Sequence, residues 1–423
     1  MPTTSTKQLW QHKAKALDKY RWLLLRQRHG IVGTATRFFR DAVRDLLFGS
    51  LAYINLRRKR DVSCNNQAAC DFLLLQSSPK VIPLKRKKKL MEQLAAKKYT
   101  IIEIAQLEPF AAAHSGCFCQ PPQPVPIRYL GYAAYAEWLI HSYNPRIVLN
   151  DRNGSLLSPF LRLSLNNRDK ILVHLAHATT LEKSRRLNMM DYDYYFLFGK
   201  SSLTALQKRP LRFGTTNAVM TGSHMIDSAY ALAPRRAPQK NILVLGVGPD
   251  KEKLPSYIDT YTMLARWADN NRDYTLTIKK HPRSSTDFWA HAATTTGNIV
   301  ILPTGYPLSE ALQEADIVIN IVSNAVMEAA LAKRPVIYVN NAATGDIFEQ
   351  ERFFGERVDN ERQMSDRINN IRRHYQQSVQ QSADFAAYHL HNGCCGLQAT
   401  VTALERLINN LELDSEKISS TVN

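Results

Sequence analysis

Two groups of polar residues follow apolar runs and together have the chemistry of a phosphate-binding site. The first group is Lys279-Lys280-His281-Pro282-Arg283, and the second is Ser323-Asn324. The first supplies cationic and imidazole donors, and the second supplies hydroxyl and amide donors at the start of an expected helix. Either group alone is typical of an exposed strand end or a helix cap. Because both follow strands expected in one sheet, we predict that Lys280, His281, Arg283, Ser323 and Asn324 bind phosphate.

Three further residues extend this predicted site toward a nucleotide. Glu328 lies four residues after Asn324, which is one helical turn, so we expect it to reach a ribose hydroxyl. Gly246 and Gly248 follow another apolar run, but the third glycine of a dinucleotide fingerprint is missing. We therefore expect these glycines to let backbone or nucleotide approach closely.

Two residues in the first half of the chain are candidates for a general base. An attacking hydroxyl must lose its proton, and both His177 and Asp151 end an apolar run where a sheet would present them to a ligand. We favour His177 and keep Asp151 as the second candidate. The alternative interpretation is that His174 and His177 are hydrogen-bonded core histidines and that Asp151 starts a turn.

The segment Asp191-Tyr192-Asp193 has the spacing of a metal-binding Asp-x-Asp motif but directly precedes a predicted strand. We interpret it as structural. We expect no metal and no cofactor, because lysine and histidine can neutralise a leaving phosphate.

Helical stretches and apolar runs alternate twice along the 423 residues, first over 71–222 and again over 242–339. Residues 228–239 lack periodicity and contain two prolines, which indicates a linker. The alternation predicts an α/β protein with two Rossmann-like domains facing a cleft. We expect a basic helical extension at 1–62, an acceptor domain at 63–230, a nucleotide-donor domain at 236–390 and a C-terminal helix and tail at 391–423.

The positive charge is concentrated near the N-terminus, where residues 1–100 hold 22 Lys and Arg against 6 Asp and Glu. Two helical stretches at 8–28 and 34–57 place Phe38, Phe39, Leu46, Leu47 and Leu51 beside arginines, and basic clusters follow at 57–60 and 85–89. This pattern favours a peripheral contact with anionic phospholipid over an ordinary solvated face or nucleic acid, since no nucleic-acid motif accompanies it. With no long apolar run or signal peptide, we expect a cytoplasmic protein on the inner membrane, its six cysteines reduced.

The order of these segments resembles that of GT-B-fold transferases. The likeness is greatest to the CDP-glycerol glycerophosphotransferase family and to capsule-type transferases that use cytidine-nucleotide sugars. It rests on residues 279–283, 316–331 and 334–338, and on 177–183, 191–196 and 221–227. Ala178 stands where the family has glycine, and Asn324 where a second serine or threonine is common. The resemblance implies that the His-Pro and serine segments hold the donor phosphates, and it gives the base role to His177.

We therefore expect a metal-independent transferase that moves a sugar from a nucleotide-activated donor, with cytidine favoured, to a cell-surface polysaccharide or lipid-linked glycan. Three alternatives stay open: a CDP-glycerol-dependent glycerophosphotransferase, a nucleotide-sugar epimerase, and a non-catalytic membrane adaptor with the same fold.

Overall fold

In a computed structural model, residues 9–58, 69–181, 184–235, 240–342 and 345–422 are described. The chain forms two compact units. The first unit contains residues up to Met225 together with Leu397–Asn423, and the second contains Ile226–Gly396. The C-terminal segment therefore returns to the first unit, although it is separated from it by the whole second unit in sequence.

The first unit is built on a sheet of seven strands in the order β12-β6-β5-β4-β3-β1-β2. The strands are β1 (Phe72–Gln76), β2 (Ile101–Ala105), β3 (Ile147–Asn150), β4 (Ile171–Leu175), β5 (Tyr194–Leu197), β6 (Thr216–Met220) and β12 (Glu416–Ile418). Strands β1 to β6 pair in parallel, while β12 adds to the edge of β6 in the antiparallel direction. The central strands are apolar without alternation because helices cover both faces of a parallel sheet.

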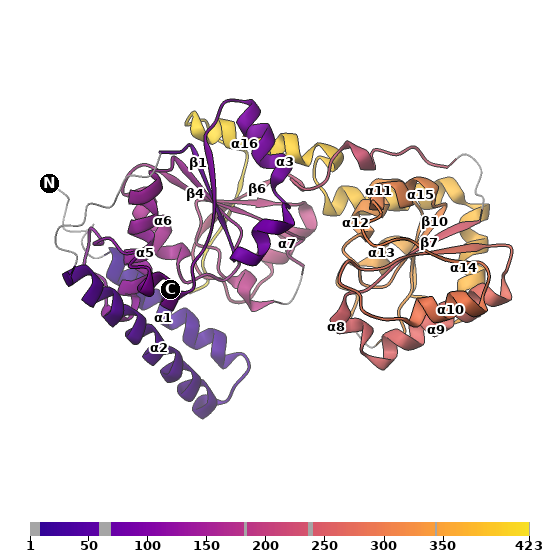
Figure 1. Cartoon of the computed structure of the whole chain (residues 1–423), viewed down its shortest axis with the longest axis horizontal. Coiled ribbons are helices and arrows are strands. Elements are labelled where there is room, and N and C mark those ends of the chain that lie inside the picture. Colours follow the sequence, from indigo (N-terminus) through magenta and orange to yellow (C-terminus); the bar gives the residue numbers. More distant parts are fainter. Residues whose placement is uncertain (1–8, 59–68, 182–183, 236–239, 343–344, 423) are drawn as a thin grey trace. The chain divides into compact units, whose positions relative to one another are not determined.

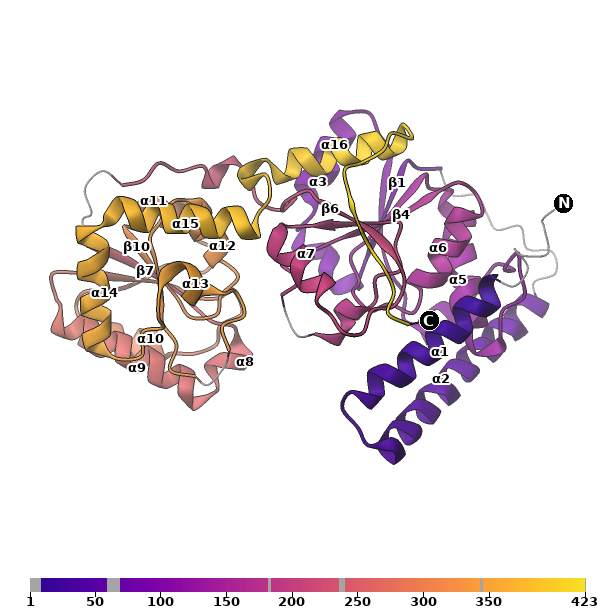
Figure 2. The same ribbon diagram turned by 180° about the vertical axis from the view of Figure 1, so that it is seen from behind.

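One layer of helices joins segments far apart in sequence. Leu90 and Leu94 of α3 (Lys88–Ala96) share an apolar cluster with Val401 and Leu404 of α16 (Gly396–Ile408). Both views show α16, in yellow, beside α3, and Figure 2 shows the C-terminal chain running along the sheet past β6 (Figures 1 and 2). The remaining helices of this unit are α4 (Pro109–His114), α5 (Ile127–Tyr143), α6 (Ser158–Asn166) and α7 (Lys200–Gln207).

The predicted N-terminal helices are present as α1 (Leu9–Arg26) and α2 (Ile31–Arg58), and they are packed into the first unit. The Trp10 ring is fully buried and lies 6.2 Å from that of Phe160 in α6. A Cβ at Gly49 would overlap the Ile127 carbonyl, so only glycine allows α2 to approach α5 this closely. Buried Asp45 of α2 pairs with Arg21 of α1. The two helices are thus an integral layer of this unit.

The second unit has a five-stranded, all-parallel sheet in the order β11-β10-β7-β8-β9. Its strands are β7 (Asn241–Leu245), β8 (Thr275–Lys279), β9 (Ile299–Ile301), β10 (Ile317–Asn320) and β11 (Val336–Tyr338). Its helices are α8 (Pro249–Glu252), α9 (Pro255–Asn270), α10 (Phe288–Thr295), α11 (Leu308–Glu314), α12 (Val326–Leu331), α13 (Gln350–Phe354), α14 (Glu361–Arg373) and α15 (Tyr375–His389). Buried Trp267 and Trp289 anchor α9 and α10 to the core.

The two-sheet α/β class and the helical N-terminus confirm the fold predicted from the sequence. Cys70, Cys394 and Cys395 are free thiols, but Cys119 is disulfide-bonded, so the expectation of six reduced cysteines is wrong for that residue.

Candidate functional sites

The second unit has a pocket of about 480 Å³ at the carboxyl ends of β7, β8 and β10, hereafter the His281 pocket. Its lining includes seven of the eight residues predicted to bind the donor: Gly246, Gly248, Lys280, His281, Arg283, Ser323 and Asn324. Residues that are up to 78 positions apart in sequence meet here because parallel strands present their carboxyl ends at one edge of the sheet.

His281 is held in one orientation within this pocket. Its Nδ1 accepts a hydrogen bond from the Arg283 backbone N–H at 3.1 Å, which leaves Nε2 to carry the proton of the neutral ring. Burial lowers the pKa of His281, and the Arg283 charge lowers it further, against an opposing effect of Glu252. At neutral pH the ring is therefore a neutral Nε2–H donor.

The two glycines of the pocket have different surroundings. A Cβ at Gly246 would lie 2.9 Å from the His281 backbone nitrogen and 3.1 Å from the Lys279 carbonyl oxygen, so this glycine lets the loop after β8 pack against β7. A Cβ at Gly248 would meet nothing within 4 Å. Gly246 thus allows a backbone approach, whereas Gly248 leaves open space in the pocket.

The segment after β10 forms a hydrogen-bonded turn. The Asn320 Oδ1 accepts from the Ser323 N–H at 3.1 Å, and the Ser323 Oγ accepts from the Ala325 N–H at 3.4 Å. The following helix, α12, has only six residues. Glu328 lies in α12, outside the lining of the His281 pocket, and burial raises its pKa to about 7.

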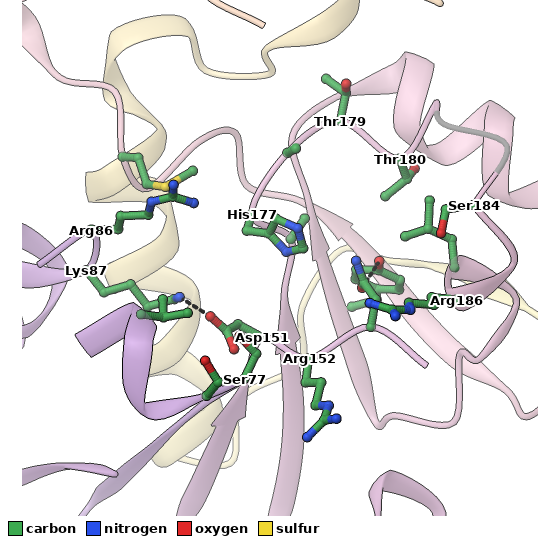
Figure 3. A pocket seen from close by; sticks show the side chains of 18 of the residues that line it. Ser77, Arg86, Lys87, Asp151, Arg152, His177, Thr179, Thr180, Ser184 and Arg186 are labelled. Carbon is green, nitrogen blue, oxygen red and sulfur yellow. Dashed lines mark hydrogen bonds and ion pairs between the residues drawn. The ribbon is translucent and has the colours of Figure 1, made fainter. Parts of the chain in front are cut away.

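The first unit has a pocket of about 470 Å³ at the carboxyl ends of its strands, hereafter the His177 pocket. His177 and Asp151, the two predicted bases, both line it. Figure 3 shows Arg86, Lys87 and Asp151 on one side of His177 and Arg186 on the other. The His177 side chain is exposed. It can therefore meet a ligand directly.

Asp151 is instead buried and paired. Its Oδ2 lies 2.6 Å from the Nζ of Lys87, with side-chain exposures of 5% and 2%, and Lys87 also donates to the Gln76 Oε1 at 3.2 Å. The Oδ1 is buried and makes no hydrogen bond with the described residues. This carboxylate balances the lysine charge and leaves one oxygen to accept a ligand hydroxyl.

Two other histidines of this unit are buried. His174 lies 3.0 Å from the Asn150 amide and 2.8 Å from the Asn153 side-chain oxygen, and its ring stacks on Tyr192. Burial lowers its pKa. His174 is therefore a hydrogen-bonded core residue, as in the alternative interpretation, whereas His177 is not buried. Burial also lowers the pKa of His224 to about 3, helped by the charges of Lys87 and His177.

The Asp191-x-Asp193 segment is structural, as interpreted from the sequence. Fully buried Asp191 lies 2.8 Å from Lys13 and 2.9 Å from Arg162, and Asp193 also pairs with Arg162 at 2.9 Å. Among the described residues, no group of three or more acidic, histidine or cysteine side chains could hold a metal ion.

Sequence reasoning missed several residues of the His177 pocket. Arg86 and Lys87 belong to the basic run 85–89, which we expected to face phospholipid, and this expectation is wrong for buried Lys87. Arg186 and Thr179 also line the pocket. The signal for Lys87 was a lysine placed one residue before an amphipathic helix whose apolar face is buried. In the segment 177–183, Glu182 and Lys183 lie outside the described residues.

Comparison with known proteins gives the fold alone. No family model matches the chain, and no curated protein matches it. Among solved structures, a UDP-N-acetylglucosamine 2-epimerase aligns over 84% of this chain and 100% of its own, with 11% identity and a TM-score of 0.50. The UDP complex of S. aureus MnaA aligns over 80% of this chain and 96% of its own, with 13% identity and a TM-score of 0.50. The likeness is one of fold. It agrees with the GT-B-type architecture expected from the sequence.

Proposed function

We propose that this protein is a glycosyltransferase that takes a sugar from a nucleotide-activated donor and attaches it to a hydroxyl of a cell-surface polysaccharide or lipid-linked glycan. The observation that carries the proposal is the pair of polar pockets. One, in the second unit, gathers phosphate donors, and the other, in the first unit, presents an accessible histidine beside a buried carboxylate.

The His281 pocket has the groups that a departing nucleotide phosphate requires. Lys280 and Arg283 supply positive charge, the neutral His281 supplies an Nε2–H donor, and the turn at Ser323 and Asn324 supplies hydroxyl and amide donors. Charge-assisted hydrogen bonds of this kind stabilise negative charge that develops as the bond to the donor sugar breaks. The leaving phosphate needs no metal in this proposal.

In the His177 pocket, the acceptor hydroxyl oxygen attacks the anomeric carbon and the carbon–oxygen bond to the donor phosphate breaks. The phosphate keeps the electron pair of that bond, and His177 takes the hydroxyl proton. The exposed imidazole suits this role better than Asp151, because protonating Asp151 would leave the buried Lys87 charge unpaired. The Oδ1 of Asp151 would instead orient the acceptor.

The test separates donor binding from chemistry. The intact chain is titrated calorimetrically with cytidine and uridine nucleotides and then with the matching nucleotide sugars. His281→Ala should weaken nucleotide binding roughly tenfold or more, the loss of about 1.5 to 3 kcal/mol expected for a hydrogen bond to a charged group. His177→Ala should keep nucleotide affinity and lose turnover. If His281→Ala binds as tightly as the wild type, the donor site is wrongly placed.

A nucleotide-sugar epimerase is the second candidate, because the S. aureus MnaA structure with this fold is a complex with UDP. An epimerase converts its substrate without an acceptor. Incubation with UDP- and cytidine-activated sugars in the absence of any acceptor distinguishes the two: an epimerised nucleotide sugar would replace the transferase proposal. Incubation with CDP-glycerol tests glycerophosphate transfer in the same way, and binding without any turnover would indicate an adaptor.

We also propose that α2 rests on an anionic membrane surface, which would bring a lipid-linked acceptor to the enzyme. Its buried face, with Asp45, Phe48, Gly49 and Ala52, packs inward. The opposite face is apolar and exposed at Val32, Phe39, Val43, Leu46, Leu47 and Ile54. Exposed apolar stripes beside arginines are typical of helices that lie in a bilayer interface. In the described part of the chain, no helix is both long and apolar enough to span a membrane.

Because α1 and α2 are packed into the first unit, substitutions test this contact better than truncation. The double variant Phe39→Asp Leu47→Asp should sediment less with vesicles rich in anionic lipid. High salt should weaken vesicle binding of the wild type. The control is Arg272→Gln, an exposed change in the second unit. Equal, salt-independent pelleting of the two forms would contradict a membrane role.

A further inference from the structure

The first unit has another pocket besides the His177 pocket, hereafter the arginine pocket. The proposed transfer step does not use it. It has a volume of about 440 Å³, within the usual range of about 300 to 1,000 Å³ for small-molecule sites. It lies between α1, α2 and the segment after β4, and its charged lining consists of Arg21, Arg28, Asp41, Arg44, Arg185 and Arg186. Five arginines thus face a single aspartate.

The internal ion pairs leave most of this charge uncompensated. Arg21 is neutralised by Asp45, with Asp41 at 3.9 Å. The guanidinium groups of Arg28 and Arg44 make no hydrogen bond or ion pair with the described residues, and both are exposed. Arg185 donates to the Leu24 carbonyl oxygen at 2.8 Å, and burial together with the nearby Arg28 charge lowers its pKa. Cations that outnumber the neighbouring carboxylates in this way form a site that favours a multiply charged anion.

Arginine is also the side chain best suited to phosphate. Its planar guanidinium donates two parallel hydrogen bonds to phosphate oxygens, and it remains charged when partly buried. Donors from α1, α2 and the loop at Arg185 and Arg186 approach from several elements, so a diphosphate could be held from more than one side.

The position of the arginine pocket relates it to the acceptor. Ser184 and Arg186 line both this pocket and the His177 pocket, so the two pockets adjoin. Its other walls are α1 and α2, and the outer face of α2 carries the exposed apolar stripe. A ligand that extends across both pockets would have an apolar part at α2, a phosphate among the arginines and a hydroxyl at His177.

We infer that the arginine pocket binds the phosphate or diphosphate of a lipid-linked acceptor, whose glycan then reaches His177. This inference rests on the proposed function for the hydroxyl at His177, but the phosphate site can be tested without it. The chemistry shared with a free phosphate is the anion itself, so the experiment separates the two sources.

The first measurement is a calorimetric titration of the intact chain with inorganic pyrophosphate. It is repeated on His281→Ala, because pyrophosphate can also enter the His281 pocket, and the component that survives is assigned to the first unit. Arg28→Gln Arg44→Gln should reduce this component on the order of a hundredfold, about tenfold for each lost charge-assisted contact. The matched control, the double variant Arg57→Gln Arg58→Gln, removes two exposed charges from the last turn of α2, outside the pocket, and should leave this component unchanged.

The second measurement is flotation with phosphatidylcholine vesicles that contain either geranylgeranyl diphosphate or uncharged geranylgeraniol. The wild type and the control should prefer the diphosphate vesicles, and Arg28→Gln Arg44→Gln should lose that preference while keeping a native circular dichroism spectrum. Pyrophosphate binding without any vesicle preference would show a site for soluble phosphate and overturn the lipid assignment. Unchanged pyrophosphate affinity in the double variant would overturn the site itself.

The transferase proposal and the arginine-pocket proposal can be refuted independently of each other. Nucleotide titration should be unaffected in Arg28→Gln Arg44→Gln, because these residues lie in the first unit and the nucleotide site is placed in the second. If the wild type binds no nucleotide, the proposed transferase function fails, while the pyrophosphate result still decides the arginine pocket.

Discussion

Breaking the buried pair of Lys87 and Asp151 should destabilise the first unit and show whether the carboxylate is structural or catalytic. The two side chains are 2% and 5% exposed, and Nζ and Oδ2 lie 2.6 Å apart. Asp151→Asn keeps the shape of the side chain but removes its charge, which leaves Lys87 as a buried cation with neutral acceptors, the Asn amide oxygen and the Gln76 Oε1 at 3.2 Å. Losing one partner of a buried pair costs about 3 to 5 kcal/mol.

For a unit of this size, each kcal/mol lowers Tm by about 2 to 4 °C, so Asp151→Asn should lower it by roughly 10 °C. Lys87→Met should have a similar effect, because it leaves the carboxylate unpaired. The double variant Lys87→Met Asp151→Asn removes both charges and should be less destabilised than the sum of the single variants by at least about 2 kcal/mol.

The assay is thermal and urea unfolding of the three variants beside His177→Ala, which removes an exposed side chain of the same pocket and should change stability by less than about 0.5 kcal/mol. A wild-type Tm for Asp151→Asn would refute the ion-pair argument. If Asp151→Asn is folded but inactive and His177→Ala stays active, the base is Asp151.

Three further predictions follow from the site and the core. Gly246→Ala should lower the free energy of unfolding by about 1 to 3 kcal/mol, because its Cβ would meet the His281 backbone nitrogen at 2.9 Å. Gly248→Ala should leave it unchanged, because its Cβ would have no neighbour within 4 Å. Equal unfolding midpoints for both variants would contradict the packing argument. The free energy of unfolding should fall as pH drops below about 6.5, because burial lowers the pKa of His389 to about 4 and the unfolded chain then binds the proton more readily. In His389→Gln, the free energy of unfolding from urea melts should depend less on pH between about 6.5 and 4. An unchanged pH dependence would count against this. Turnover should survive EDTA, because Arg162 holds both carboxylates of the Asp-x-Asp segment, and a loss restored by Mg²⁺ would show a metal requirement.

Much of the architecture could be predicted from local sequence. Strand β4 and strand β8 lie within the two stretches, 71–222 and 242–339, where the sequence predicts alternating helices and strands, because continuous apolar runs between polar segments are typical of buried parallel strands. The start of strand β6 is harder to recognise in the sequence, because its first two residues, Thr216 and Asn217, are polar. Strand β12 could not be predicted, because an edge strand of three residues carries no periodic signal.

The sequence by itself determined which residue types follow which strands, and this was enough to group His281 with Ser323 and to select His177. Only the tertiary structure decided how each group is used. In the sequence, Lys87 cannot be distinguished from the other cations of its basic run. The structure shows that it is buried and paired with Asp151. Likewise, the arginines of α1, α2 and the loop at Arg185 form a pocket only where these elements pack together. Strand periodicity is encoded locally, whereas burial, charge pairing and pocket walls depend on contacts between residues distant in sequence.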